Sequence, residues 1–326
     1  MDNFSYSRPA TLRDAAADIA KEKAHGRVML LAGGTDLLGE MKDNLAAPER
    51  LVSLTHVKEL QGIRPVAAGL RIGAATLLAD IAESAVVQEK APLLAMAAGK
   101  VGTPQIRNMG TLGGNLCQRP RCWYYRNNYP CYKHGGNTCF SALGENDYHA
   151  ILDAGPSFIV HPSDTASALV ALGASARIVG AAGRERHVIM DKFFVLPRDN
   201  VRRENVLLPD EILAEIMVPT AAGGSKAIFV KEMVREIWDF PLCSVAAMVT
   251  LQNSVVQDAR IVLGGVAPIP YRALKAEAAI KGQTLNEASA TAAGIAATDG
   301  ARPLAKNGYK VPLTQAVVKR ALLSLA

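Results

Sequence analysis

The 326-residue chain lacks any long run of apolar residues and any sign of a leader segment. No stretch approaches the roughly 18 consecutive apolar residues that a membrane-spanning helix requires. The first residues, Met1 to Tyr6, have neither the basic region nor the apolar region of a signal peptide. These absences predict a soluble protein that is made in the cytoplasm.

A strong excess of one charge is also missing. The chain has 36 Lys and Arg against 30 Asp and Glu, a net charge of +6, and the basic residues are scattered. A scattered excess of this size is poor evidence for nucleic-acid binding. With 49% apolar and 20% charged residues, the composition is typical of a globular protein and excludes a disordered one. The length predicts two domains of ordinary size, or three small ones.

Cysteine is scarce, and its five occurrences are unevenly placed. Cys243 stands alone, and the other four share one segment as Cys117, Cys122, Cys131 and Cys139. This clustering excludes a small scaffold stapled by evenly placed disulfides. Residues 117–156 show little apolar periodicity, and so long an irregular segment indicates a functional or cofactor-stiffened loop. The four thiols could ligate an iron-sulfur cluster, ligate zinc, or be reduced thiols without a ligand. Iron-sulfur ligation is favoured over zinc, because the cysteines of zinc knuckles are usually closer together in the sequence.

Three histidines near this loop are further ligand candidates: His134, His149 and His161. Hydrogen bonding is the commoner role for a lone histidine. The chain lacks a G-x-S-x-G motif or any other arrangement that suggests a Ser/His/Asp nucleophile.

Short strands and helices are predicted to alternate in the first third of the chain. A strand over 28–32 precedes two glycines and a helix over 36–42, and Thr11 is the expected N-cap of a helix that runs to about Lys23. Other strands are expected at 4–6, 51–54, 157–160, 176–179, 185–189, 226–234, 244–251 and 258–264, and a hairpin-like pair is expected around 69–73. Other helices are expected at 76–84, at 92–100, at 165–172 with Asp164 as N-cap, and from Leu274 onward. A boundary at 220–225 then leaves an α+β domain at the C-terminal end.

Two glycine-rich turns are candidate phosphate sites. They are Gly33-Gly34-Thr35-Asp36 and Gly110-Thr111-Leu112-Gly113-Gly114-Asn115. Backbone N–H groups between a strand and a helix can bind phosphate, although each turn by itself has a plain structural explanation. Neither matches a Walker A loop or G-x-G-x-x-G, but two such loops together suit the two phosphates of a dinucleotide.

Three charged residues outside these loops have two interpretations each. Asp164 can cap a helix or accept hydrogen bonds from a ribose. Lys231 and Arg235 can belong to a solvated strand face or contact an anionic cofactor.

Taken in order, these segments resemble the medium, FAD-binding subunit of molybdenum hydroxylases, the family of xanthine dehydrogenase, carbon monoxide dehydrogenase and 4-hydroxybenzoyl-CoA reductase. The matching segments are 32–37, 105–108, 110–115, 161–164, 209–213, 239–240 and 263–268. The resemblance spans nearly the whole chain and implies an α+β fold. It implies a p-cresol methylhydroxylase-type FAD-binding domain at 1–220, with α+β subdomains at about 1–55 and 56–220. A small α+β C-terminal domain of the carbon monoxide dehydrogenase flavoprotein type would follow at 221–326.

The resemblance also implies which residues bind FAD. By position they are Ala32, Gly33, Gly34, Thr35, Asp36, Leu37, Ile106, Asn108, Gly110, Thr111, Gly113, Gly114, Asn115, Asp164, Leu213 and Lys231. The two loops would hold the pyrophosphate, and Asp164 would contact the ribose or nearby polar groups. Leu213 and Lys231 would lie near the flavin ring.

The segment at about 117–157 resembles the extra 4Fe-4S loop of the 4-hydroxybenzoyl-CoA reductase and periplasmic aldehyde oxidoreductase branches. By that resemblance Cys122, Cys131 and Cys139 are cluster ligands. The fourth thiolate of the pattern falls where this chain has Ser157. The fourth ligand is therefore open between Cys117 and Ser157.

The implied function is that of an FAD and iron-sulfur electron-transfer subunit in a heterotrimeric molybdenum hydroxylase. Its partners would be a large subunit with the molybdenum cofactor, a small subunit with 2Fe-2S clusters, and an external electron acceptor. No general acid or base is then expected in this chain, and export to the periplasm is possible with a signal-bearing partner. The alternatives are a self-sufficient FAD oxidase of the same fold and a non-enzymatic, zinc-stabilised interaction module.

Overall fold

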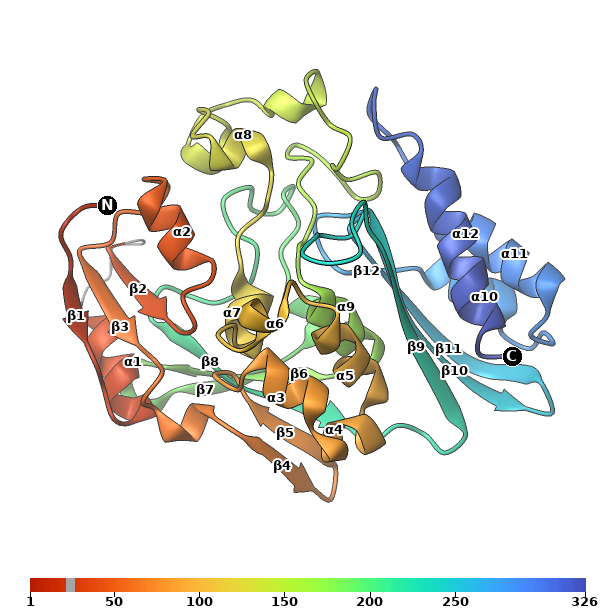
Figure 1. Cartoon of the computed structure of the whole chain (residues 1–326), viewed down its shortest axis with the longest axis horizontal. Coiled ribbons are helices and arrows are strands. Elements are labelled where there is room, and N and C mark those ends of the chain that lie inside the picture. The colour runs from red at the N-terminus through yellow and green to blue at the C-terminus, as the bar shows by residue number, and fades with distance from the viewer. Residues whose placement is uncertain (22–26) are drawn as a thin grey trace.

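A small parallel sheet begins the computed structural model, which describes residues 1–21 and 27–326 (Figure 1). Its strand order is β1-β3-β2, with β1 at Ser5–Ser7, β2 at Val28–Leu31 and β3 at Arg50–Ser53. Helix α1, Leu12–Ala20, packs beside it, and the Thr11 hydroxyl accepts a hydrogen bond from the Asp14 N–H, which confirms the predicted N-cap. The predicted end of this helix at Lys23 lies outside the described residues.

A five-stranded sheet follows, in which the central strand is one that the sequence analysis did not predict. The order is β4-β5-β8-β6-β7, with bounds Ile63–Val66, Gly69–Gly73, Glu211–Pro219, Ser175–Gly180 and Glu185–Ile189. Strand β8 is buried for most of its length although it carries two carboxylates. Arginines on the two outer strands of the sheet compensate them, because Arg186 of β7 pairs with Glu211 at 2.6 Å and Arg64 of β4 pairs with Glu215 at 3.1 Å.

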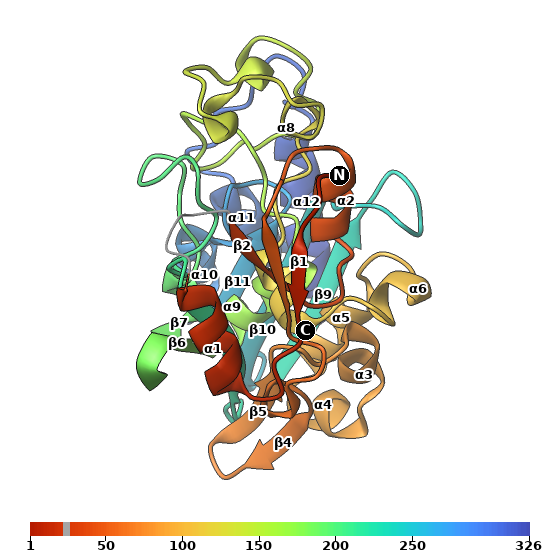
Figure 2. The ribbon, with the colours of Figure 1, turned by 90° about the vertical axis from the view of Figure 1, so that its left-hand side faces the viewer.

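Helices cover this sheet on the side that faces the rest of the molecule (Figures 1 and 2). They are α3 Leu78–Glu83, α4 Ala85–Lys90, α5 Pro92–Gly99 and α9 Asp164–Ala171. The predicted N-cap of the last helix is wrong by one residue: the Ser163 hydroxyl accepts from the Ala166 N–H at 3.1 Å, and Asp164 is the first helical residue. The strand predicted at 157–160 is also wrong, because its backbone groups bond to separate loop residues and form no ladder.

The C-terminal part is an antiparallel sheet between two sets of helices. Strand order is β12-β11-β10-β9, with bounds Tyr271–Arg272, Val255–Gly264, Cys243–Gln252 and Ser225–Glu232. Helices α10 Leu274–Ile280, α11 Glu287–Ala297 and α12 Lys310–Leu323 pack on one face, as Figure 1 shows. Alternate residues of β10 divide between two cores: Val245 packs with these helices and Ala246 packs with α9. The predicted strands and helical tail are confirmed here.

The segment predicted to be irregular contains only short helical turns. These are α8 Trp123–Arg126, η2 Tyr132–His134 and η3 Phe140–Ala142, which follow the end of α7, Leu112–Cys117. Short elements elsewhere are α2 Leu37–Lys42, η1 Lys58–Leu60, α6 Pro104–Arg107, η4 Ala181–Gly183 and η5 Met190–Lys192. Polar contacts hold the insertion, residues 117–157, to the C-terminal part. Lys310, a buried side chain, donates to the carbonyl oxygens of Tyr148 at 2.9 Å and Gly265 at 2.7 Å. Within the described ranges no helix has the length and apolarity to cross a membrane.

Candidate functional site

The two predicted glycine loops lie against each other. A Cβ atom on Gly33 would stand only 1.8 Å from the carbonyl oxygen of Met109, and one on Gly110 would stand 3.7 Å from the Thr35 hydroxyl. Gly34 has φ +74°, a conformation that glycine adopts without a steric penalty. Position 33 requires glycine for a different reason, because its backbone touches that of Met109 in the second loop.

An open cleft runs along the joined loops. It contains about 1720 Å³ of space, part of it open to solvent. Predicted site residues that line it are Ala32, Gly33, Gly34, Thr35, Asp36, Leu37, Thr111, Gly113, Gly114 and Leu213. Apolar side chains of β2 and the start of β8 also line it. The cleft thus combines apolar side chains with the backbone of the loops, a combination that is typical of cofactor sites.

The two loops differ in the hydrogen-bonding capacity that they offer to a ligand. Within the described chain, the backbone N–H groups of Gly34, Thr35 and Asp36 have no hydrogen-bond partner. The N–H of Gly113 instead donates to the Ala74 carbonyl at 2.7 Å, and that of Gly114 donates to the Thr111 hydroxyl at 3.1 Å. The first loop can therefore bind an anion through its backbone, whereas the second mainly shapes the cleft.

Six predicted site residues lie outside the lining of the cleft: Ile106, Asn108, Gly110, Asn115, Asp164 and Lys231. The Asn115 side-chain oxygen accepts from the hydroxyls of Ser163 and Thr165 at 2.6 and 2.7 Å. Asp164 and Lys231 form an ion pair of 2.7 Å that joins α9 to β9, with both side chains buried. Burial raises the pKa of the Asp164 carboxyl, and Lys231 opposes this shift.

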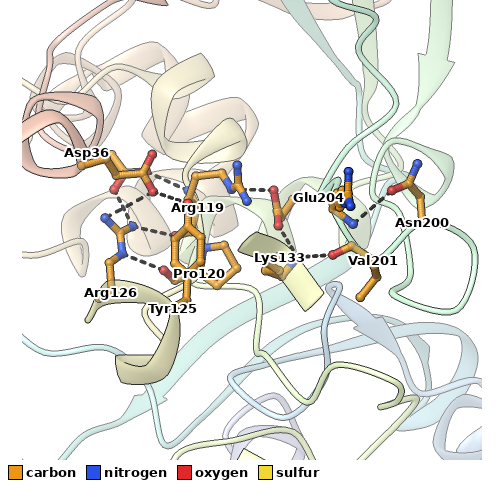
Figure 3. Close-up of polar contacts among 11 residues, drawn as sticks. Asp36, Arg119, Pro120, Tyr125, Arg126, Lys133, Asn200, Val201 and Glu204 are labelled. Atoms are coloured by element: carbon orange, nitrogen blue, oxygen red, sulfur yellow. Dashed lines mark hydrogen bonds and ion pairs between the residues drawn. The ribbon is translucent and has the colours of Figure 1, made fainter. Parts of the chain in front are cut away.

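Arginines of the insertion hold the acidic start of helix α2 (Figure 3). Asp36 pairs with Arg121 and Arg126 at 2.8 Å each, and it accepts the Arg119 backbone N–H at 2.7 Å. One turn later, Glu40 accepts from the Tyr125 hydroxyl at 2.9 Å. Burial raises the pKa of the Glu40 carboxyl. The insertion is thereby fixed to the first glycine loop without a large apolar core.

The segment between β7 and β8 supplies a wall of the cleft that the sequence analysis missed. Residues 202–205 and 207–209 line the cleft. Glu204 pairs with Arg119 at 2.9 Å and with Lys133, which ties this segment to the insertion (Figure 3). The one available signal was the basic dipeptide Arg202-Arg203, which has no local pattern that indicates a ligand.

The clustered cysteines divide between two places. Cys122, Cys131 and Cys139 line one small cavity together with Ser157, whereas Cys117 lines the dinucleotide-sized cleft. All five cysteines of the chain are free thiols. Burial raises the pKa of Cys122 to about 11 and that of Cys117 to about 12.

The three candidate histidines have different surroundings. His149 Nε2 lies 3.2 Å from Cys122 Sγ, and His134 Nε2 lies 3.0 Å from the Tyr125 carbonyl oxygen. His161 packs edge-on against Phe194, and burial lowers its pKa to about 3. In the part of the chain that the structure describes, no three His, Cys, Asp or Glu side chains converge closely enough to hold a single metal ion.

Known proteins of the same architecture cover the whole chain. Residues 2–221 match the family described as the FAD binding domain in molybdopterin dehydrogenase, and residues 228–325 match the CO dehydrogenase flavoprotein C-terminal domain. The aldehyde oxidoreductase FAD-binding subunit PaoB of Escherichia coli K12 is 33% identical over 100% of this chain and 98% of its own length. The carbon monoxide dehydrogenase medium chain of Hydrogenophaga pseudoflava is 30% identical over 98% and 96%.

Solved structures agree with these matches. Carbon monoxide dehydrogenase from Hydrogenophaga pseudoflava has a chain that superposes with a TM-score of 0.79 at 29% identity, over 99% of this chain and 97% of that one. Quinoline 2-oxidoreductase from Pseudomonas putida 86, at 24% identity and a TM-score of 0.77, shows the same fold. The predicted family and fold are therefore confirmed. The chain belongs to the FAD-binding medium subunits of the molybdopterin dehydrogenase family and is an oxidoreductase subunit.

Proposed function

We propose that the chain binds FAD in the cleft and acts as the electron-transfer subunit of a heterotrimeric molybdenum hydroxylase. A large subunit with the molybdenum cofactor and a small subunit with 2Fe-2S clusters would be its partners, and an external acceptor would take the electrons. The observation that carries the proposal is the pair of glycine loops on one cleft, the first with unpaired N–H groups. The relatives support it, since two of them are named as an FAD-binding subunit and a medium chain.

The residues of the cleft have distinct proposed roles. FAD, when bound, supplies the capacity to exchange electrons singly and in pairs. The N–H groups of residues 34–36 would hold a phosphate, and Leu213 would give the flavin an apolar wall. Ile106, Asn108, Gly110 and Asn115 would support the second loop. Asp164 and Lys231 would border the flavin end, where the domain at 1–220 meets the domain at 221–326.

Bound flavin is the first test of this function. The purified full-length chain is expected to be yellow and to release FAD on denaturation, in a ratio near one per chain. Incubation with small alcohols or aldehydes is expected to leave the flavin oxidised, because another subunit would carry the substrate site. A colourless chain that takes up no added FAD would overturn the proposal. Bleaching of the flavin by substrate would support the self-sufficient oxidase instead.

We further propose that the insertion holds a 4Fe-4S cluster. Cys122, Cys131, Cys139 and Ser157 line one cavity, which supports ligation of the cluster through these four residues. Cluster thiolates bind different iron atoms, so they need not converge on one point as the ligands of a single zinc ion do. Cys117 is the weaker candidate for the fourth ligand because it faces the other cleft.

Iron analysis tests which of these cysteines are cluster ligands. Anaerobically purified chain is expected to contain about four iron atoms and as much acid-labile sulfide, as such a cluster requires. Cys131→Ala should remove most of the iron and sulfide, whereas Cys117→Ala should leave the content of both unchanged. Stoichiometric zinc without sulfide in the wild-type chain, or equal iron loss in the two variants, would refute this ligand set. FAD content is measured in parallel, so that failure of the cluster proposal is distinguished from failure of the flavin proposal.

A further inference from the structure

The cleft has positive charge that no carboxylate of the described chain neutralises. Four acidic residues line it, and each already has a basic partner: Asp36, Glu40, Glu204 and Glu211. Among the basic residues of the lining, Arg119 is paired with Glu204. Arg202 and Arg203 form no ion pair within the described residues. The cleft wall therefore carries cations that only a ligand or solvent can balance.

The two arginines differ in what their guanidinium groups contact. The Arg203 side chain donates to the carbonyl oxygen of Leu207, four residues along the same segment. For Arg202, the only hydrogen bond found in the described structure is made by its backbone N–H, which donates to the Asn200 side-chain oxygen at 3.0 Å. Arg202 is exposed to solvent. Its five N–H donors are thus available to a bound molecule.

The backbone around Arg202 is anchored although its side chain is not. Lys133 donates to the carbonyl oxygen of Val201 at 3.0 Å and to the Glu204 carboxylate, and Arg119 holds Glu204 from the other side (Figure 3). Such anchoring on both sides lowers the entropy that a ligand contact at Arg202 must overcome. The backbone at Arg202 is thus held in place, while its exposed guanidinium lines the cleft.

We propose that Arg202 is a binding residue for the diphosphate of FAD, because it lines the same cleft as the first glycine loop. This inference rests on the proposed function and adds a side-chain cation to a site whose predicted anion contacts are backbone N–H groups. Arginine matches phosphate because its planar guanidinium can donate two parallel hydrogen bonds. The ligand class is a nucleoside diphosphate, and the contact does not depend on the flavin ring.

The test uses deflavinated full-length chain and two probes, FAD and ADP. Arg202→Gln is expected to weaken the binding of FAD and of ADP roughly tenfold, the usual scale of a lost charge-assisted hydrogen bond. The variant should also show a smaller dependence of FAD affinity on salt concentration. The matched control is Arg198→Gln, because Arg198 belongs to the same segment but pairs with Asp153 and lies outside the cleft lining. The control should bind both probes as the wild type does. Affinities are measured by calorimetry or flavin fluorescence.

Each outcome decides the matter. Equal affinities of Arg202→Gln and wild type for FAD would overturn the inference while leaving the proposed function intact. Failure of the wild-type chain to bind FAD would overturn the proposed function itself. Weaker FAD binding with unchanged ADP binding would also contradict a diphosphate contact. If Arg202→Gln melts at a lower temperature than wild type, Arg202→Lys is used, and it should retain part of the affinity and salt dependence because it keeps the charge.

Discussion

Gly33→Ala is expected to abolish tight FAD binding, whereas Gly39→Ala should leave it unchanged. The added methyl group at position 33 would stand 1.8 Å from the Met109 carbonyl oxygen, far inside any possible contact distance. Backbone lies on both sides, so neither loop can yield by rotating a side chain. The loops must separate, at a cost of about 1–3 kcal/mol in stability, typical of overpacking.

Gly39 is a stringent control for this variant. It lies only six residues further along, in helix α2, and a Cβ there would meet nothing within 4 Å. Alanine favours a helix interior over glycine by about 1 kcal/mol, so Gly39→Ala should be neutral or slightly stabilising. The FAD affinity and the melting temperature of the two deflavinated variants are compared by FAD titration and thermal unfolding. If Gly33→Ala bound FAD as tightly as Gly39→Ala, the close approach of the loops would not matter for the site.

Asp164→Asn is expected to lower the free energy of unfolding by about 3–5 kcal/mol, the usual cost of breaking a buried ion pair. The Lys231 side chain is only 1% exposed, so its ammonium group would stay buried without a counter-charge. Among the described residues, its ammonium group has one other hydrogen bond, to the Lys100 carbonyl oxygen at 3.0 Å. Urea unfolding of the full chain measures the loss.

An exposed ion pair provides the control for this second variant. Asp210 pairs with Arg184, whose side chain is 63% exposed, and Asp210→Asn should cost less than about 1 kcal/mol. The double variant Asp164→Leu/Lys231→Met should recover much of the loss, because it removes both charges from the buried position. Equal destabilisation by Asp164→Asn and Asp210→Asn would contradict the structural role of the buried pair.

Local patterns explain which parts of the fold were predictable. The strand predicted at 28–32, the Thr11 cap and the C-terminal strands each depend on neighbours along the chain, and the structure contains all of them. Strand β8 was missed because Glu211 and Glu215 interrupt its apolar pattern. Only pairing with Arg186 and Arg64 on other strands makes burial of those carboxylates possible.

The one-residue error at helix α9 has a different cause. Ser163 and Asp164 are both good N-cap residues, so the local pattern does not distinguish them. The ion pair with Lys231 uses the Asp164 carboxylate, and the Ser163 hydroxyl caps the helix instead. A contact between α9 and β9 therefore decides a feature that is normally local.

The sequence by itself determined the family, the two glycine loops and the clustering of the cysteines. Only the tertiary structure decided which thiols share a cavity: Cys117 ends helix α7 and faces the cleft, while Cys122 lies beside Cys131 and Cys139. It also decided the charge of the cleft, because Asp36 is neutralised by Arg126, a residue far away in the chain, while Arg202 is left without a partner among the described residues. Electrostatic balance depends on distance in space, which spacing along the chain does not specify.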